Sequence, residues 1–170
     1  GLCAPGAAGK AQPKSPEPLL VVVSVDALRH DFLARPQAAF MRSLGDPASD
    51  VNAGVGAHSG RLRPQFPSYT FSNHYTMVTG LRPARHGILG NAAYDAGTDK
   101  VFRVGTDDAS PADQVWWRAE PVFATAARQG VHAASLAWPG NAGISESLVV
   151  TRQQGFLFPA TCSVGNEICQ

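Results

Sequence analysis

The sequence predicts an α/β fold from two observations. Residues 19–25 form a short, continuously apolar and β-branched run, typical of a central parallel strand that is covered on both faces. Residues 120–130 indicate a helix, with a proline near the start, an alanine-rich interior and a glycine at the end. Residues 131–138 then predict a further strand. This order of elements is typical of a βαβ-type repeat.

The composition is that of an ordinary globular chain and excludes some partners. The 170 residues fit one domain or part of a larger one, with 44% hydrophobic and 16% charged residues. The net charge of +1 leaves no basic patch for nucleic acid or for an acidic membrane surface. We expect no transmembrane segment in this chain, because no apolar run approaches the roughly 20 residues that span a bilayer. Membrane anchoring and oligomeric state stay open.

The two ends of the sequence differ from its middle. Residues 1–18 are rich in proline, alanine, glycine and lysine and predict a flexible linker. Residues 151–170 carry Cys162 and Cys169, while Cys3 lies at the other end. The spacing of the three cysteines fits no zinc-ribbon or redox pattern, so a Cys162–Cys169 disulfide and free thiols remain alternatives.

Between the predicted strands, the sequence indicates one further helix and two loops. Residues 31–44 place apolar side chains on one helical face, and Pro36 is expected to start the regular helix. Residues 45–60 contain four glycines and predict a surface loop, in which His58 is expected to be solvated. Residues 98–114 are polar and also predict a loop.

The stretch 63–80 places a threonine near the start of a helix. Pro64 and Pro67 keep the chain extended as it arrives at Thr70. An i, i+4, i+7 apolar spacing then predicts a helix that Gly80 closes, its members being Phe71, Tyr75 and Val78. Thr70 either caps this helix or presents its hydroxyl to an anion at the helix N-terminus.

Two further polar residues have a local and a functional interpretation. Asp26 directly follows the run 19–25, where it caps the next helix or, at the carboxyl end of a parallel strand, binds a cation or phosphate. Asn91 lies in a glycine-flanked turn, where an isolated asparagine is usually a turn former; its functional interpretation depends on the resemblance described next.

These residues lie in three blocks that resemble the ectonucleotide pyrophosphatase/phosphodiesterase family of the alkaline phosphatase superfamily. The blocks are residues 20–29, residues 66–81 and residues 86–95, and weaker matches follow at 117–130 and 138–140. The resemblance covers roughly residues 19–145. It implies that residues 19–150 are the N-terminal portion of a catalytic domain, with 151–170 as a divergent tail. It also implies an alkaline phosphatase-like α/β fold, a mostly parallel sheet flanked by helices, incomplete in this chain.

The resemblance also implies roles for individual residues. Thr70 is expected to be the nucleophile and a metal ligand, Asp26 a zinc ligand, and Asn91 a catalytic residue that contacts phosphate. Phe71 matches an aromatic residue that stacks on the nucleobase, and a core position is the alternative. His74 and His86 are expected to be structural. The sequence departs from the family pattern at Ala27, where glycine is usual, and at Leu28, where an aromatic residue is usual.

The implied activity is zinc-dependent hydrolysis of phosphodiester or pyrophosphate bonds through a phosphothreonyl intermediate. Substrates would be nucleotides or related diesters, outside the cell or at its surface. The remaining ligands of the two zinc ions are not found in this sequence, so a fragment or truncated product without catalysis is one alternative. Cleavage of choline-containing phospholipids and nucleotide binding without turnover are the others.

Overall fold

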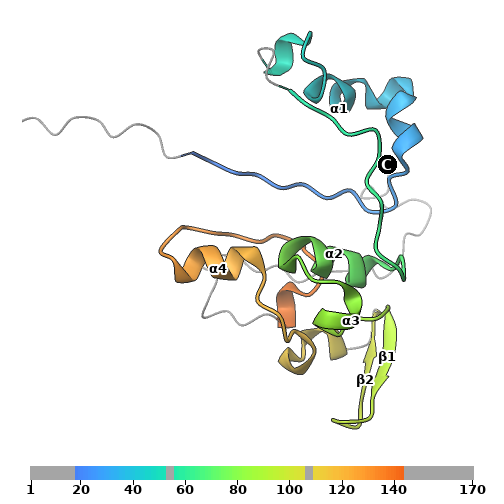
Figure 1. The fold of residues 1–170 in the computed structure, drawn as a ribbon, viewed down its shortest axis with the longest axis vertical. Coiled ribbons are helices and arrows are strands. Elements are labelled where there is room, and N and C mark those ends of the chain that lie inside the picture. Colours follow the sequence, from blue (N-terminus) through green and yellow to red (C-terminus); the bar gives the residue numbers. More distant parts are fainter. Residues whose placement is uncertain (1–17, 53–55, 106–108, 144–170) are drawn as a thin grey trace, which may run out of the picture.

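The structure is a computed structural model that describes residues 18–52, 56–105 and 109–143 (Figure 1). Its helices are α1 (Ala39–Leu44), α2 (Thr70–Thr79), α3 (Pro83–His86) and α4 (Val122–Arg128). Its strands are β1 (Ala92–Asp95) and β2 (Lys100–Arg103), and short 3-10 turns lie between these elements. The expected linker 1–18 (except Pro18), the tail 151–170 and the three cysteines lie outside the described residues. None of the helices in the described ranges is long and apolar enough to cross a bilayer.

Helix α2 begins and ends where the sequence predicts. The chain enters it through Tyr69, whose backbone is extended, and Thr70 is its first helical residue. Gly80 ends it in the left-handed conformation with φ of 69°, which glycine adopts without a steric cost. The predicted helices around residues 31–44 and 120–130 are also confirmed, as a 3-10 turn from Pro36 that leads into α1 and as α4 after Pro121.

An aromatic core lies between α2 and the hairpin that β1 and β2 form. Phe71 and Tyr75 of α2 are at most 2% exposed and pack against buried rings from later segments. The ring centroids of Phe71 and Phe102 are 5.8 Å apart, and those of Tyr75 and Trp117 are 5.0 Å apart, both edge to face. This core holds the N-terminal end of α2 against the hairpin.

The prediction of a loop over residues 98–114 was partly wrong. Residues 100–103 form β2, which pairs antiparallel with β1 in the register Ala93 with Phe102. Two 3-10 turns follow, Ser110–Ala112 and Gln114–Trp116. The strands are four residues long, too short for a clear alternation, and burial of Phe102 in the core makes the pairing favourable.

The two segments expected to be parallel strands, residues 19–25 and 131–138, do not pair in the structure. No strand is assigned to either, and the sheet found among the described residues is the antiparallel pair of β1 and β2. The apolar side chains of 19–25 are exposed, Leu19 to 86% and Leu20 to 85%. A strand needs the backbone groups of a neighbouring strand, and no other described segment supplies them to residues 19–25.

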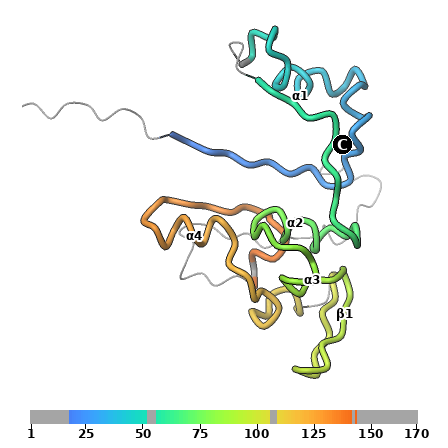
Figure 2. The backbone as a smooth tube through the Cα atoms, in the orientation of Figure 1, coloured from blue at the N-terminus to red at the C-terminus, as the bar shows by residue number. Residues whose placement is uncertain are grey.

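The N-terminal part of the described chain stands apart from the rest. The segment with α1 extends away from the body formed by α2, α3, α4 and the hairpin, as the tube in Figure 2 also shows. The chain passes from residues 18–29 into this outlying part and returns along residues 56–69 to the start of α2. The segment that contains Asp26 and the segment that leads into Thr70 therefore both connect the outlying part to the body.

Candidate functional site

Thr70 and Asp26 form the centre of the candidate site. The Thr70 hydroxyl donates a hydrogen bond to Oδ2 of Asp26 at 3.0 Å, although the two residues are 44 positions apart. Thr70 is not the cap of α2, because Tyr69 occupies that position and Thr70 is the first helical residue. Its side chain is therefore free to face the carboxylate. Asp26 does not cap a helix either, since the next turn begins at His30.

Asn91 lies at the same end of α2. Its side-chain oxygen accepts a hydrogen bond from the Phe71 backbone N–H at 3.4 Å, and its own carbonyl accepts one from Val104 at 2.8 Å. The second contact holds Asn91 at the entrance of the hairpin. Because the amide oxygen faces the helix, the Nδ2 group is the end of the amide that remains to donate to a ligand.

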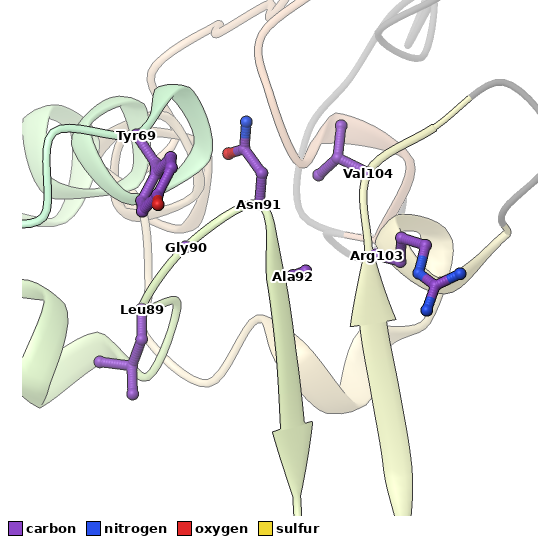
Figure 3. A pocket seen from close by; sticks show the side chains of 7 residues that line it. All are labelled: Tyr69, Leu89, Gly90, Asn91, Ala92, Arg103 and Val104. Atoms are coloured by element: carbon purple, nitrogen blue, oxygen red, sulfur yellow. The ribbon is translucent and has the colours of Figure 1, made fainter.

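A shallow pocket of about 350 Å³ adjoins this position. Its lining is shown in Figure 3 and consists of Tyr69, Leu89, Gly90, Asn91, Ala92, Arg103 and Val104. Tyr69 is the residue before α2, and Asn91 is the residue before β1. The Arg103 guanidinium points away from the Asn91 amide in this view. The pocket therefore adjoins Asn91 and Tyr69, the residue before Thr70, whereas Thr70 itself is not part of its lining.

The first turn of α2 adds a favourable electrostatic environment for an anion. The N–H groups of a helix's first turn have no partner within the helix, and the helix dipole places a partial positive charge there. In this chain Thr70, Phe71 and Ser72 form that turn, and the Phe71 N–H donates to the Asn91 side chain, so the N–H groups of Thr70 and Ser72 are the candidates for an anion. A phosphoryl group bound here would meet a hydroxyl, helix N–H groups and an amide side chain.

Phe71 lies in the core in this structure. Its side chain is 2% exposed, with Phe102 and Trp117 against it at centroid distances of 5.8 and 6.2 Å. A nucleobase stacks only on an accessible ring face, and Phe71 offers none here. The structure thus favours the core alternative for Phe71 over the expected stacking contact, because the aromatic neighbours already occupy its surroundings.

His86 is a buried structural residue. It is 1% exposed, and its Nδ1 accepts a hydrogen bond from the Ile88 N–H at 3.2 Å. Nε2 must then carry the proton, and it lies 3.1 Å from the Ser72 carbonyl. Burial lowers the pKa of the imidazole, so the neutral form is favoured. These contacts use both ring nitrogens and leave neither for a metal.

His74 is buried as well, at 6% exposed, and both of its ring nitrogens have partners. Nδ1 lies 2.8 Å from the Thr70 carbonyl oxygen, and Nε2 lies 2.9 Å from the Ser24 hydroxyl. Sequence reasoning missed Ser24. Its position two residues before Asp26 could have identified it, because residues i and i+2 share one face of an extended segment.

Two oxygen atoms of the described residues lie where they could bind one metal ion. Asp26 Oδ2 and Thr70 Oγ1 are adjacent oxygens, which fit two positions on one cation. Zinc usually takes four ligands, and the described ranges contain no group of three or more His, Cys, Asp or Glu side chains that could hold a metal. A complete site needs ligands that this part of the chain does not supply.

Three kinds of comparison relate this chain to known proteins. The sequence model of a family described as type I phosphodiesterase/nucleotide pyrophosphatase matches residues 20–157. An uncharacterised pyrophosphatase/phosphodiesterase of Schizosaccharomyces pombe is 37% identical over 143 residues, covering 84% of this chain and 28% of the relative. Ectonucleotide pyrophosphatase/phosphodiesterase family member 3 of Bos taurus is 34% identical over 136 residues, covering 76% of this chain and 14% of the relative. This chain therefore spans less than a third of the length of these relatives.

Solved structures show the same relationship. Human ectonucleotide pyrophosphatase/phosphodiesterase 5 aligns with a TM-score of 0.57 and 32% identity, over 69% of this chain and 29% of its own. The murine protein of the same name, an inactive threonine-to-alanine variant in complex with AMP, aligns with a TM-score of 0.56 and 28% identity over the same shares. These neighbours confirm the expected alkaline phosphatase-like α/β fold class, of which the described residues form a part.

Proposed function

Because this chain belongs to the type I phosphodiesterase/nucleotide pyrophosphatase family, we propose that it carries the nucleophile of a site that hydrolyses phosphodiester or pyrophosphate bonds. The observation that carries the proposal is the hydrogen bond from the Thr70 hydroxyl to Asp26 at the N-terminal end of α2. The murine relative supports it, because that protein is described as inactive after replacement of a threonine and as binding AMP.

In the proposed reaction, Thr70 Oγ attacks the phosphorus of the substrate. A bond forms between this oxygen and phosphorus, the bond from phosphorus to the leaving oxygen breaks, and a phosphothreonyl intermediate results. The proton of the Thr70 hydroxyl passes to solvent water, and the leaving oxygen takes up a proton from water. Asp26 accepts the hydrogen bond of the Thr70 hydroxyl and so orients the oxygen for attack. Water then attacks the phosphorus, releases the phosphoryl product and returns the hydroxyl to Thr70.

The groups around Thr70 suit the developing charge. Negative charge on the non-bridging oxygens is stabilised by donors that are already oriented before the reaction. The Thr70 backbone N–H is one such donor, and the Asn91 Nδ2 group is the other. The bond from the Phe71 N–H to the Asn91 oxygen holds the amide in the orientation that this task requires.

Asp26 and Thr70 would hold Zn²⁺, the cofactor that we propose, with the other ligands of a two-zinc site supplied from outside the described residues. When bound, zinc acts as a Lewis acid that favours the deprotonated hydroxyl and offsets charge on the phosphoryl oxygens. An unassisted threonine hydroxyl is a poor nucleophile at neutral pH, so the proposal predicts that a chelator lowers turnover.

We infer that the substrate is a nucleotide or a similar small phosphodiester, and that the protein works outside the cell or at its surface. The AMP complex of the murine relative supports the first point. The second rests on relatives named ectonucleotide enzymes and on a venom phosphodiesterase of Crotalus adamanteus, which is 33% identical over 122 residues.

A second candidate is nucleotide binding without turnover. The observation that favours it is the lack, within the described ranges, of a third metal ligand near Asp26. Both candidates predict affinity for AMP, and they differ in turnover.

The test is replacement of Thr70 in the full-length protein. Thr70→Ala is expected to lower kcat on a chromogenic nucleotide phosphodiester by about a thousandfold or more, because the variant lacks the hydroxyl that would form the covalent intermediate. Thr70→Ser keeps the hydroxyl and serves as the matched control, with activity expected within about tenfold of the wild type.

Calorimetric titration with AMP completes the design. Thr70→Ala should still bind AMP, which would show that the variant is folded. Full turnover by Thr70→Ala would overturn the nucleophile assignment. AMP binding by the wild type without zinc-dependent turnover would favour the binding module.

A further inference from the structure

Two side-chain hydrogen bonds join the segment that carries Asp26 to helix α2. One runs from the Thr70 hydroxyl to Asp26 Oδ2 at 3.0 Å. The other links the Ser24 hydroxyl to His74 Nε2 at 2.9 Å. Ser24 precedes Asp26 by two residues, and His74 follows Thr70 by four. The two hydrogen bonds therefore lie next to each other, and both join the extended segment to the helix.

The distance between Ser24 and Asp26 along the extended segment matches the distance between Thr70 and His74 along the helix. Residues i and i+2 of an extended chain lie on one face, about 6.6 Å apart at 3.3 Å per residue. Residues i and i+4 of a helix also share a face, about 6 Å apart along the axis at 1.5 Å per residue. A shift of the segment by one residue would turn Ser24 and Asp26 away from the helix together. The pair thus selects one register.

His74 is fixed in the orientation that this register needs. Its Nδ1 lies 2.8 Å from the Thr70 carbonyl, which can only accept, so Nδ1 carries the proton. Nε2 is then the acceptor of the Ser24 hydroxyl. The Trp138 ring packs edge-on at 5.2 Å, and Trp138 Nε1 donates to the His74 carbonyl at 3.3 Å. The imidazole therefore touches both the nucleophile's backbone and the segment of the carboxylate.

In the described structure, the segment of Asp26 is not joined to its neighbours by backbone hydrogen bonds. Among the described residues, no backbone–backbone hydrogen bond joins residues 19–26 to another segment. Within the described structure, the Ser24–His74 and Asp26–Thr70 contacts are the hydrogen bonds that join this segment to α2.

We propose that Ser24 and His74 are positioning residues that hold Asp26 at the Thr70 hydroxyl, an inference that rests on the proposed function of Thr70. The Ser24–His74 hydrogen bond sets the register of the extended segment against α2. In this register, the Asp26 carboxylate meets the Thr70 hydroxyl. Neither Ser24 nor His74 touches the reacting atoms.

The test uses four variants of the full-length protein. Ser24→Ala removes the hydroxyl, and Ser24→Thr keeps it on a side chain suited to extended backbone. His74→Asn keeps a donor near the Thr70 carbonyl and loses the atom that faces Ser24. The fourth variant combines Ser24→Ala with His74→Asn. Ser59→Ala is the matched control, since the Ser59 hydroxyl donates only to the nearby Arg61 carbonyl in an exposed loop.

The expected kinetic result separates positioning from binding. Ser24→Ala and His74→Asn should each lower kcat by about ten- to a hundredfold, with KM within about twofold. Ser24→Thr should stay within about threefold of the wild type. The double variant should lose no more than the larger single effect, because both changes remove one contact. Wild-type kcat in Ser24→Ala, or single effects that multiply in the double variant, would overturn the proposal.

A second measurement does not depend on turnover. In an NMR spectrum of this chain, the Thr70 methyl group should show nuclear Overhauser contacts to the Asp26 β protons. These contacts should persist in Ser24→Thr and vanish in Ser24→Ala, and their persistence in Ser24→Ala would overturn the positioning role. Thr70→Ala separates the two ideas: its retained activity refutes the proposed function, whereas its loss together with a fully active Ser24→Ala refutes the positioning role alone.

Discussion

Ala27 has a backbone conformation that favours glycine. Its φ is 56°, in the left-handed region, where a Cβ approaches the following carbonyl and costs about 1–2 kcal/mol. The residue directly follows Asp26, at a position where the resemblance implies glycine. The departure from the family pattern at Ala27 thus has a structural consequence, because the turn after the carboxylate is strained.

We predict that Ala27→Gly raises the free energy of unfolding by about 0.5–1 kcal/mol. Relief of the left-handed strain outweighs the greater entropy that glycine has in the unfolded chain. Urea denaturation measures the effect. Ala39→Gly is the matched control, because Ala39 has φ of −55° at the start of α1 and the change there should lower stability by up to about 1 kcal/mol. Destabilisation by Ala27→Gly would contradict the strain.

The second prediction at the residue scale concerns His86 and pH. Burial lowers the pKa of His86 in the folded state, so the unfolded chain binds a proton more readily. The free energy of unfolding should therefore fall as the pH drops below the unfolded value of about 6.5 and continue to fall down to the folded pKa. Protonation at Nδ1 would also remove the acceptor of the Ile88 N–H.

The measurement is urea denaturation of the wild type and of His86→Gln between pH 7.5 and about 5. The variant is expected to be less stable at pH 7.5 and to lose less stability on acidification. An equal pH slope in both proteins would show that His86 does not cause the dependence.

At the scale of the element, one hydroxyl joins α2 to the segment before α4. The Tyr75 hydroxyl donates to the Ala119 carbonyl at 2.5 Å and accepts from the Ala119 N–H at 2.7 Å. Tyr75 is fully buried, at 0% exposed. One side chain thus satisfies both backbone groups of a residue outside any helix or strand.

Tyr75→Phe should lower the free energy of unfolding by about 1–3 kcal/mol. Both backbone groups of Ala119, a partly buried residue, lose their partner, and a polar group left unsatisfied away from water is costly. Thermal or urea denaturation checks the change. Tyr94→Phe is the control, because the Tyr94 hydroxyl donates to Asp99 from a side chain that is 64% exposed, and its loss should cost less than about 0.5 kcal/mol. Equal effects of the two variants would contradict the bridging role.

At the scale of the whole molecule, the body of the described chain has a packed core, whereas the outlying part exposes apolar side chains. The buried apolar residues lie in the body, in a cluster of Phe71, Tyr75, Ile88, Phe102, Trp116 and Trp117. In the outlying part, by contrast, Phe40 on α1 is 66% exposed, and the apolar residues of 19–25, in the extended segment that leads to this part, are exposed as well. The stability of the described structure therefore comes mainly from the body.

Two phenylalanine variants test this division. Phe102→Ala should lower the free energy of unfolding by about 3–5 kcal/mol, because it removes a ring that is 1% exposed from the aromatic core. Phe40→Ala should change it by less than about 0.5 kcal/mol, since that ring is already in contact with water. Urea denaturation monitored by tryptophan fluorescence compares them. A large loss in Phe40→Ala would show that the outlying part is packed in solution.

The sequence by itself determined the elements whose signals are local. Pro64 and Pro67 before α2, Gly80 after it, and Pro121 and Gly130 around α4 act on their immediate neighbours, so their effects could be predicted without knowing the fold. The family resemblance, carried by contiguous blocks, also selected Thr70, Asp26 and Asn91. Their roles in a reaction remain predictions.

Only the tertiary structure decided which distant groups meet. It placed Asp26 against a hydroxyl 44 residues away, put Ser24 against His74, buried Phe71 among rings from the hairpin, and paired β1 with β2 while residues 19–25 stayed unpaired in the described structure. Local patterns state what a segment can form, whereas hydrogen bonds and burial depend on which other segment is within reach. That depends on how the whole chain packs.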